Sequence, residues 1–372
     1  MNFRQPVRTV TGTPPSTSER STPIRVLTAD DSALIRLTLN RYLNRYSDVE
    51  VVGQASNGRE LLSLAASLRP DVVVSDVEMP EMNGLEALAQ LMRTNPIPVI
   101  MLSNLTSEGA EVTMQALEIG AFDFVVKPQP GVTMAETVEI LIEKIRHAAE
   151  APARLSGRLS RAIAGVAGVA QKQQSTSKLV AALQASDTLL MVASSTGGPS
   201  ALTGFFSAIA PDLPIGGVIV QHMPAGFTTI LSERLDKSCH YRVLEAKPGA
   251  KIQRGQFLVA PGGSHLIFDE KGVAHLSDAP TVNGVRPAAD VTMKSLAKIY
   301  KDQILAVVLT GMGKDGYAGA QEISQCGGKI LAQDEDSCVV YGMPRHIIES
   351  NLAQGVGSPE SLGRSIAGRV TE

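Results

Sequence analysis

The segment DVVVSDVEMPEMNG, residues 71–84, is the stretch from which the fold of the first half of the chain can be worked out. Its first five residues form a short, mostly apolar run that is typical of a strand buried on both faces. Asp76 follows directly, and Pro80 and Gly84 are turn residues that lead into a helical pattern. A buried strand, a carboxylate at its end and a following helix together predict one unit of a parallel α/β sheet.

The same alternation extends to both sides of this segment. Further strands are expected over residues 24–29, 49–55, 98–103 and 122–126. Helices are expected to begin near Ser32, Gly58, Gly84, Glu108 and Thr133. Five strands and five helices within about 125 residues make one doubly wound domain with a parallel sheet.

A second alternation starts at Leu189 and predicts a second, mostly parallel α/β sheet. Its strands are expected over residues 189–193, 217–221, 241–246, 257–260, 266–269, 273–276, 304–309 and 329–332. Its helices are expected to follow Gly198, Phe227, Ala289, Asp315, Pro344 and Pro359. The hairpin over residues 265–276 turns at residues 269–272 and is expected to be antiparallel.

We therefore expect an α/β protein with two domains, at residues 23–147 and 187–372. Residues 1–22 are rich in Thr, Ser, Pro and Arg and are expected to be a disordered extension. Residues 148–186 are rich in Ala, Ser, Gln and Arg and are expected to be a solvated linker with some helix.

The composition argues against several classes of protein. A formal charge of −3 and an isoelectric point near 6.1 disfavour binding to nucleic acid, and 4% aromatic residues without tryptophan leave few platforms for stacking bases. Three cysteines are too few and too scattered for a disulfide framework or a zinc site. No apolar run approaches the roughly 20 residues of a membrane span, and the N-terminus has no apolar stretch of the signal-peptide type. We expect a cytoplasmic protein that does not insert into membranes.

Polar residues stand at the ends of four predicted strands in the first half. Asp30 and Asp31 follow the first strand, Asp76 the third, Ser103 ends the fourth and Lys127 follows the fifth. Taken singly, each acidic residue is typical of a helix cap or turn, and Lys127 of a surface charge. Together at one sheet edge they favour a site for a hard cation such as Mg²⁺, with a carboxylate that can accept a phosphoryl group.

The second half contains a candidate serine nucleophile. In MVASSTGGPSAL, residues 191–202, Ser195 stands where a strand meets two glycines that open a helix. Free N–H groups at a helix N-terminus favour developing negative charge, which suits acyl transfer. The pattern is not the G-x-S-x-G elbow of common hydrolases. The alternative is a serine cap in a glycine-rich turn.

His222 and Asp315 are the candidates for a base and an orienting acid. His222 ends the next strand in VIVQHMP, residues 218–224, and the other histidines precede strands, flank the hairpin or lie in helical patterns. Asp315 lies in the glycine-rich loop of VVLTGMGKDG, residues 307–316. The alternatives are a structural histidine and a cap of the following helix. A shared sheet edge favours a Ser-His-Asp triad.

Two resemblances follow from these motifs. DD at 30–31, DVEMPEMNG at 76–84, Ser103 and KP at 127–128 resemble a response-regulator receiver domain with a flavodoxin-like fold, over about residues 24–147. The resemblance implies that Asp76 accepts the phosphoryl group and binds Mg²⁺ together with Asp30 and Asp31. It also implies that Ser103 and Lys127 read out the phosphoryl group, and that a chemotaxis-type histidine kinase is the phosphodonor.

The second half resembles the chemotaxis protein-glutamate methylesterase/protein-glutamine glutaminase (CheB) family. The motifs that carry the resemblance are STGGP at 195–199, QHMP at 221–224, APGG at 260–263, LTGMGKDG at 309–316 and YGMP at 341–344. The family hydrolyses glutamate methyl esters on chemoreceptors, and many members deamidate receptor glutamines, without a cofactor for this chemistry. By resemblance Ser195 is the nucleophile, His222 the base and Asp315 the orienting acid. Met312 then supplies an oxyanion N–H, and Thr196 is a hydrogen-bond partner in the site.

The chain departs from the family's pattern in two places, with Ala193-Ser194 instead of G-A before the serine and RPAAD at 286–290 instead of R-P-S-V-D. Ser194 stands where the family has alanine, and it is expected to point away from Ser195 on the strand. Ala288 stands where the family has serine in R-P-S-V-D, and the missing hydroxyl is expected to bear on substrate contacts. Neither change removes a predicted catalytic group.

The sequence is compatible with three functions for the whole chain. The favoured reading is a phosphorylation-activated hydrolase at receptor arrays, whose unphosphorylated receiver covers the catalytic rim. In that reading simple tethering by the receiver is the alternative form of control. The second reading is a receiver-controlled interaction module that has lost catalysis. The third is a transcription factor, which the absence of a short basic DNA-binding unit disfavours.

Overall fold

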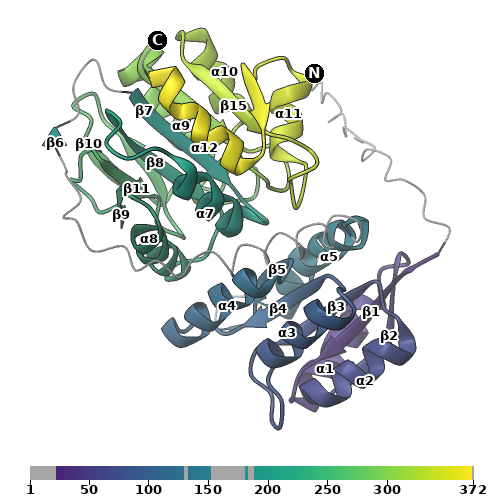
Figure 1. Ribbon diagram of the computed structural model, residues 1–372. Helices are drawn as coiled ribbons and strands as arrows, with labels where there is room; N and C mark the ends of the chain where they lie inside the picture. Colours follow the sequence, from purple (N-terminus) through teal and green to yellow (C-terminus); the bar gives the residue numbers. More distant parts are fainter. Residues whose placement is uncertain (1–21, 130–132, 152–180, 183–187, 371–372) are drawn as a thin grey trace, which may run out of the picture.

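The computed structural model describes residues 22–129, 133–151, 181–182 and 188–370. The chain folds into two α/β lobes that pack against each other (Figure 1). The expected N-terminal extension lies almost wholly outside the described residues, as does most of the expected linker. The expected boundary at residue 147 falls inside a helix that continues to Glu150.

The first lobe is a five-stranded parallel sheet with the strand order β2-β1-β3-β4-β5. Its strands are β1 (Ile24–Ala29), β2 (Val49–Ala55), β3 (Val72–Asp76), β4 (Val99–Ser103) and β5 (Asp123–Val126). Its helices are α1 (Ala33–Leu43), α2 (Gly58–Leu68), α3 (Gly84–Thr94), α4 (Ser107–Ile119) and α5 (Met134–Glu150). Helices α1 and α5 pack on each other, while α2, α3 and α4 form a second row, so both sheet faces are covered.

Local sequence explains where these elements begin and why they are buried. Every residue of β3 and β4 is buried, as expected for apolar strands covered on both faces. Helix α3 begins with a capping box, in which Asn83 accepts from the Glu86 N–H and the Glu86 carboxylate accepts from the Asn83 N–H. The doubly wound parallel fold predicted for this half is confirmed.

The second lobe is a seven-stranded, all-parallel sheet with the order β16-β15-β14-β7-β8-β11-β9. Its strands are β7 (Thr188–Ser194), β8 (Ile215–Gln221), β9 (Arg242–Glu245), β11 (Gln256–Val259), β14 (Ile304–Val308), β15 (Lys329–Gln333) and β16 (Gly355–Gly357). Its helices are α7 (Gly198–Ala208), α8 (Phe227–Ser238), α9 (Ala289–Tyr300), α10 (Tyr317–Gln325), α11 (Met343–Glu349) and α12 (Pro359–Val370), with a 3-10 turn at Lys301–Gln303.

The helices of this lobe form two layers. Helices α7, α8 and α12 pack over one face of the sheet, and α9, α10 and α11 over the other. The predicted antiparallel hairpin is present as β12 (His265–Phe268) and β13 (Ala274–Ser277). A further short pair joins β6 (Ala181–Ala182), inside the expected linker, to β10 (Gln253–Arg254). The mostly parallel sheet with a hairpin is therefore confirmed.

The two lobes share hydrophobic packing across their interface. The Phe124 ring in β5 stacks on the Phe227 ring at the start of α8, with centroids 4.5 Å apart and planes at 13°. Val340 of the second lobe is buried in the cluster formed by α1, α5 and the first sheet. Helices α4 and α8 also pack together. The α4–β5–α5 side of the first lobe is therefore the side that faces the second (Figure 1).

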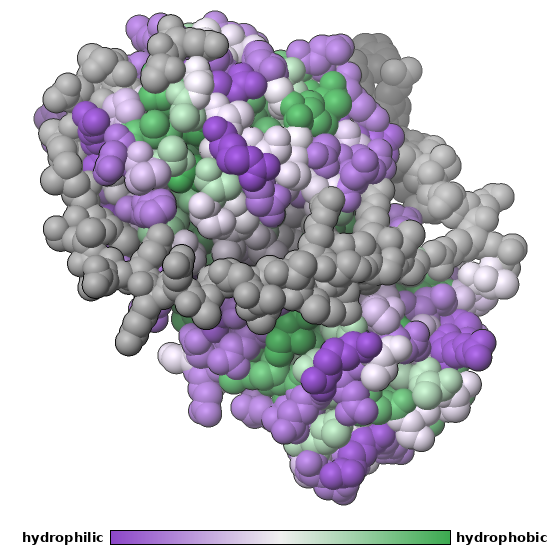
Figure 2. Space-filling view, in the orientation of Figure 1, coloured by the Kyte–Doolittle hydropathy of each residue, from purple (hydrophilic) through white to green (hydrophobic). Residues whose placement is uncertain are grey.

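One face of the molecule is mostly polar where the described residues are visible. Figure 2 shows hydrophilic and intermediate residues over most of this face, with scattered apolar patches on both lobes. No helix among the described residues is both long enough and apolar enough to pass through a bilayer.

Candidate functional site

Three adjacent strands of the second lobe carry the predicted catalytic residues. The strands β14, β7 and β8 are neighbours, and Ser195 follows β7 while His222 follows β8. Asp315 lies in the loop after β14. The chain runs from β7 outward to β8 and later returns to pair β14 with the other side of β7, so the strand order reverses at β7. Such a reversal opens a crevice at the carboxyl ends of the strands, where ligands bind in open α/β sheets.

Ser195 is fixed through its backbone rather than through its hydroxyl. Its N–H donates to the Thr310 carbonyl at 3.0 Å, and its carbonyl accepts from the Gly198 N–H at 2.7 Å. The Gln221 side chain also donates to the Ser195 carbonyl at 2.9 Å. Within the described residues the Ser195 hydroxyl has no hydrogen-bond partner, so it is free to react or to meet a substrate.

Glycines allow the surrounding loops to approach Ser195 closely. A Cβ atom at Gly311 would lie 2.7 Å from the Ser195 Cβ and 2.4 Å from the Met343 sulfur. A Cβ at Gly198 would lie 1.9 Å from Gln221 Oε1. Real Cβ atoms do not approach other atoms this closely, so both positions require glycine.

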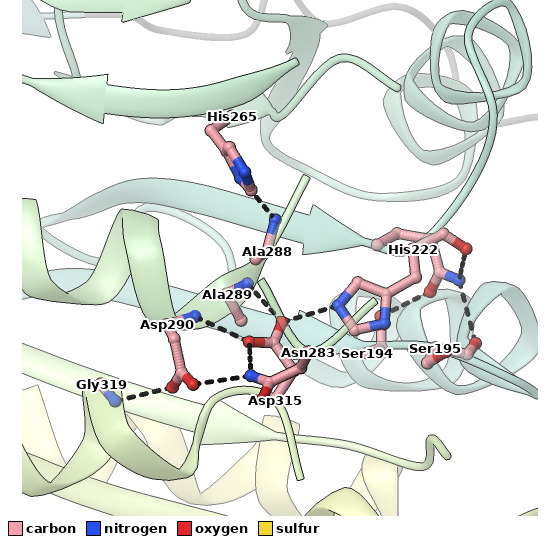
Figure 3. Close-up of polar contacts among 11 residues, drawn as sticks. Ser194, Ser195, His222, His265, Asn283, Ala288, Ala289, Asp290, Asp315 and Gly319 are labelled. Carbon is pink, nitrogen blue, oxygen red and sulfur yellow. Dashed lines mark hydrogen bonds and ion pairs between the residues drawn. The ribbon is translucent and has the colours of Figure 1, made fainter. Parts of the chain in front are cut away.

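His222 and Asp315 form the polar pair beside Ser195. His222 Nε2 lies 2.8 Å from Asp315 Oδ2, and both side chains are buried. A carboxylate can only accept a hydrogen bond, so the proton lies on Nε2 and the lone pair of the neutral ring on Nδ1. Figure 3 shows the imidazole between the Asp315 carboxylate and Ser195.

Asp315 also caps the N-terminus of helix α9. Its Oδ2 accepts from the Ala289 N–H at 2.5 Å, and its Oδ1 accepts from the Asp290 N–H at 3.2 Å. Burial acts to raise the pKa of Asp315, but the hydrogen bonds from His222 and these two amides outweigh it and hold the pKa below its usual value. Asp315 therefore caps α9. The alternative drawn from the sequence, a cap of the helix that follows Asp315, is wrong, because α10 has no side-chain cap.

Ala288 occupies the N-cap position of α9 and has no side chain that caps it. It is fully buried, and its N–H donates to His265 Nδ1 at 3.2 Å. The hydroxyl missing at this position therefore concerns the helix terminus and not, as expected from the sequence, a surface that meets the substrate.

Ser194 points away from Ser195, as its place on the strand predicts. Its hydroxyl donates to Gln221 Oε1 at 2.6 Å in the interior of the lobe. Gln221 also donates to the His222 carbonyl at 3.2 Å, so one side chain ties the ends of β7 and β8 together. Gln221 is a site residue that was not predicted from the sequence, although its place directly before His222 in a buried strand is a usable signal.

Thr196 and Met312 both lie where the two lobes meet. The resemblance implies that Thr196 bonds within the site, but its hydroxyl donates to Asp123 Oδ2 in β5 at 2.5 Å. The Met312 side chain packs against the hydrophobic cluster that joins Val340 to the core of the first lobe. Among the described residues no acceptor takes up the Met312 N–H, which leaves it available to an oxyanion.

The first lobe gathers the predicted acidic residues at its own carboxyl edge. Asp30, Asp31 and Asp76 can each offer an oxygen, and these oxygens lie within 4.8 Å of one another. Lys127 Nζ lies 2.9 Å from Asp30 Oδ2 and 2.7 Å from Asp76 Oδ2. Burial raises the pKa of Asp76 to about 6, against the opposing effect of Lys127. This set of hard oxygen donors fits a divalent cation such as Mg²⁺.

Ser103 is buried close to the same edge, but its hydroxyl is bound to helix α4. It accepts from the Thr113 hydroxyl at 2.6 Å and donates to the Gly109 carbonyl at 3.3 Å. Helix α4 also carries Glu111 and Glu118, which both pair with Arg234 of α8. Ser103 is thus linked through one helix to the interface between the lobes.

Comparisons with known proteins cover both lobes. The family model for CheB methylesterase matches residues 190–366, and that for the response regulator receiver domain matches residues 26–139. The protein-glutamate methylesterase/protein-glutamine glutaminase of Symbiobacterium thermophilum is 40% identical over 94% of this chain and 98% of its own. The corresponding protein of Thiobacillus denitrificans is 42% identical over 92% of this chain and 96% of its own. The crystal structure of the Thermotoga maritima CheB methylesterase catalytic domain is 38% identical, covers 50% of this chain and 97% of its own, and has a TM-score of 0.46.

Proposed function

The chain belongs to the protein-glutamate methylesterase/protein-glutamine glutaminase family, and we propose that it hydrolyses methyl esters of glutamate side chains on chemoreceptors. We propose that it also deamidates specific receptor glutamines. The observation that carries the proposal is the meeting of Ser195, His222 and Asp315 at three adjacent strand ends, with His222 Nε2 2.8 Å from Asp315 Oδ2.

The proposed reaction is acyl transfer through Ser195. His222 Nδ1 takes the hydroxyl proton as Ser195 attacks the side-chain carbonyl, and Asp315 stabilises the imidazolium that forms. The Met312 N–H binds the oxyanion. Protonated His222 then gives the proton to the leaving methoxide oxygen, which departs as methanol, or to the amide nitrogen of a glutamine, which departs as ammonia. Water attacks the acyl-enzyme by the same route and restores Ser195.

The first lobe is proposed to accept a phosphoryl group on Asp76 from a chemotaxis-type histidine kinase. Asp30, Asp31 and Asp76 would hold Mg²⁺, which supplies charge neutralisation for phosphoryl transfer. Lys127 and Ser103 would bind the phosphoryl oxygens. Because chemoreceptors are the proposed substrate, we propose that the protein acts at receptor arrays.

Control by covering fits the contacts between the lobes better than tethering alone. Thr196, next to Ser195, is bound by Asp123, and Val340 is buried in the core cluster of the first lobe. Movement of Ser103 toward a phosphoryl group would break its bonds to Gly109 and Thr113. Without these bonds helix α4 would be free to shift, and its packing against α8 would weaken. The phosphorylated lobe would thereby uncover the rim.

An interaction module without catalysis is the second candidate function. One comparison separates it from the proposal: methanol release from a receptor fragment whose glutamates carry methyl esters, for Ser195→Ala and Ser194→Ala. We expect Ser195→Ala to lose turnover by several orders of magnitude, as for triad members in general. We expect Ser194→Ala to retain turnover and to lose about 1 kcal/mol of stability with its hydrogen bond. A lack of methanol release in the wild type as well as in both variants would favour the module.

A further inference from the structure

A two-residue turn stands directly over the triad acid. Val282 and Val285 exchange both backbone hydrogen bonds at 3.1 Å, and Asn283 and Gly284 between them have φ angles of 54° and 77°. Two successive positive φ angles define a type I′ turn, which Asn-Gly favours. The turn itself is exposed, and Figure 3 shows the Asn283 side chain reaching the carboxylates beneath it.

The Asn283 amide bridges two buried carboxylates. Its Nδ2 lies 3.1 Å from Asp315 Oδ1 and 3.0 Å from Asp290 Oδ2. An amide nitrogen carries two hydrogens, so it can donate one to each carboxylate. Asp315 Oδ2, the other oxygen, is the one that meets His222.

The two carboxylates act on each other because both are buried and close to the same nitrogen. Burial raises the pKa of Asp290, and the charge of Asp315 raises it further. The Gly319 N–H donates to Asp290 Oδ1 at 2.7 Å, and the cation of Lys294 opposes the rise. Among the described residues, His222 is the titratable group that acts on Asp315, and Lys294 is the cation that acts on Asp290. Asn283 is the uncharged donor that contacts both members.

We propose that Asn283 is a positioning residue of the hydrolase: its bridging amide keeps Asp290 and Asp315 both ionised and holds Asp315 Oδ2 on His222 Nε2. Without the bridge, the pair would retain a shared proton at a higher pH. Asp315 would then lose part of its ability to orient and stabilise the imidazolium. This inference rests on the proposed function for its effect on turnover, but not for its effect on the titration of the two carboxylates.

Two replacements remove the bridge and keep the turn. Asn283→Asp is isosteric and retains an Asp-Gly turn, and Asn283→Gly tolerates the positive φ without a side chain. In the full chain we expect the acid limb of kcat/KM against pH to move up by about one pH unit in Asn283→Gly, and further in Asn283→Asp. At a pH on this acid limb we expect kcat to fall about tenfold while KM changes little, and activity to recover as the pH rises.

Asp290→Asn provides the rescue. In the double variant Asn283→Gly/Asp290→Asn the second charge is gone, so we expect the acid limb to return toward that of the wild type. The same titration is followed without substrate through the NMR signal of the proton on His222 Nε2, which should survive to lower pH in the wild type than in either single variant. Single variants that lose only thermal stability, with an unmoved acid limb and an unmoved NMR titration, would overturn the positioning role. If the wild type releases no methanol while the NMR titration still differs between the wild type and the single variants, only the proposed function is overturned.

Discussion

Thr196 donates a 2.5 Å hydrogen bond to Asp123, so the residue beside Ser195 is held by a carboxylate from the other lobe. Both residues are buried. Lys144 Nζ lies 2.5 Å from the same Asp123 oxygen and donates to the Phe124 carbonyl at 2.9 Å. The contact therefore joins β5 and α5 of the first lobe directly to the loop of the proposed nucleophile.

Removing this contact is expected to raise the basal activity of the unphosphorylated chain. A hydrogen bond to a charged group contributes about 1.5–3 kcal/mol, and each 1.4 kcal/mol shifts an equilibrium tenfold. We expect Asp123→Ala to increase methanol release from a small receptor fragment by about tenfold or more. The matched control is Asp48→Ala, which removes another carboxylate paired with α5, at Arg146, away from the catalytic rim. Equal basal rates in the two variants would exclude Asp123 as part of the inhibitory contact.

The Arg234 ion pairs predict that inhibition weakens with salt. Arg234 of α8 lies 2.7 Å from Glu111 and also pairs with Glu118, and both glutamates are exposed. Exposed pairs contribute about 0.2–1 kcal/mol and are screened by salt, so raising the ionic strength should increase the basal rate up to about fivefold. Arg234→Gln should show the higher rate at low salt and little further response. The charge-swapped variant Arg234→Glu/Glu118→Arg should regain part of the inhibition; no recovery would argue that the pair plays no part in docking.

Much of the fold could be predicted from the sequence because buried parallel strands carry an unmistakable apolar run. The runs that became β1 and β14 were located to within a residue. The edge strand β16 was not predicted, since Gly355 and Gly357 leave it with one apolar side chain. Edge pairing of this kind depends on the neighbouring strand β15 and not on local propensity.

The candidate site could be predicted less completely. Ser195, His222 and Asp315 carry signals in their own motifs, and their catalytic roles stay predictions. The contact between Thr196 and Asp123 joins two lobes that are far apart in the sequence, and no local pattern records it. Asn283 did carry a signal, because Val-Asn-Gly-Val is a strong two-residue turn pattern. The contact of this turn with Asp315 could not be predicted, because it depends on how α9 packs against the loop of Asp315.

Replacement of Asp76 should separate phosphorylation from the hydrolase chemistry. We expect Asp76→Asn to take up no phosphoryl group from a small donor and to stay at the basal rate, because the carboxylate nucleophile is absent. Removal of Mg²⁺ by a chelator should have the same effect on the wild type. Asp71→Asn is the control, since Asp71 lies just before the opposite end of β3 and binds the Arg25 N–H. Labelling that persists in Asp76→Asn would point to another phosphoacceptor.

The separated second lobe should be faster than the whole unphosphorylated chain. In the full chain the first lobe bonds to Thr196, next to Ser195, and buries Val340. Residues 187–372 alone lose these contacts. If the contacts hold the rim closed by the 1–3 kcal/mol that is common in allosteric coupling, the isolated lobe should release methanol about 5–150-fold faster.

The comparison needs a small substrate and a test of inhibition in trans. A short receptor fragment removes any advantage that tethering gives by bringing the enzyme to large arrays. The separate first lobe, residues 1–151, should slow the isolated second lobe only at high concentration, because the covalent connection no longer supplies a high effective concentration. Ser195→Ala in the isolated lobe gives the background rate. If the isolated lobe is no faster than the unphosphorylated chain on this substrate, covering is wrong, and phosphorylation must act by tethering or by direct activation of the site.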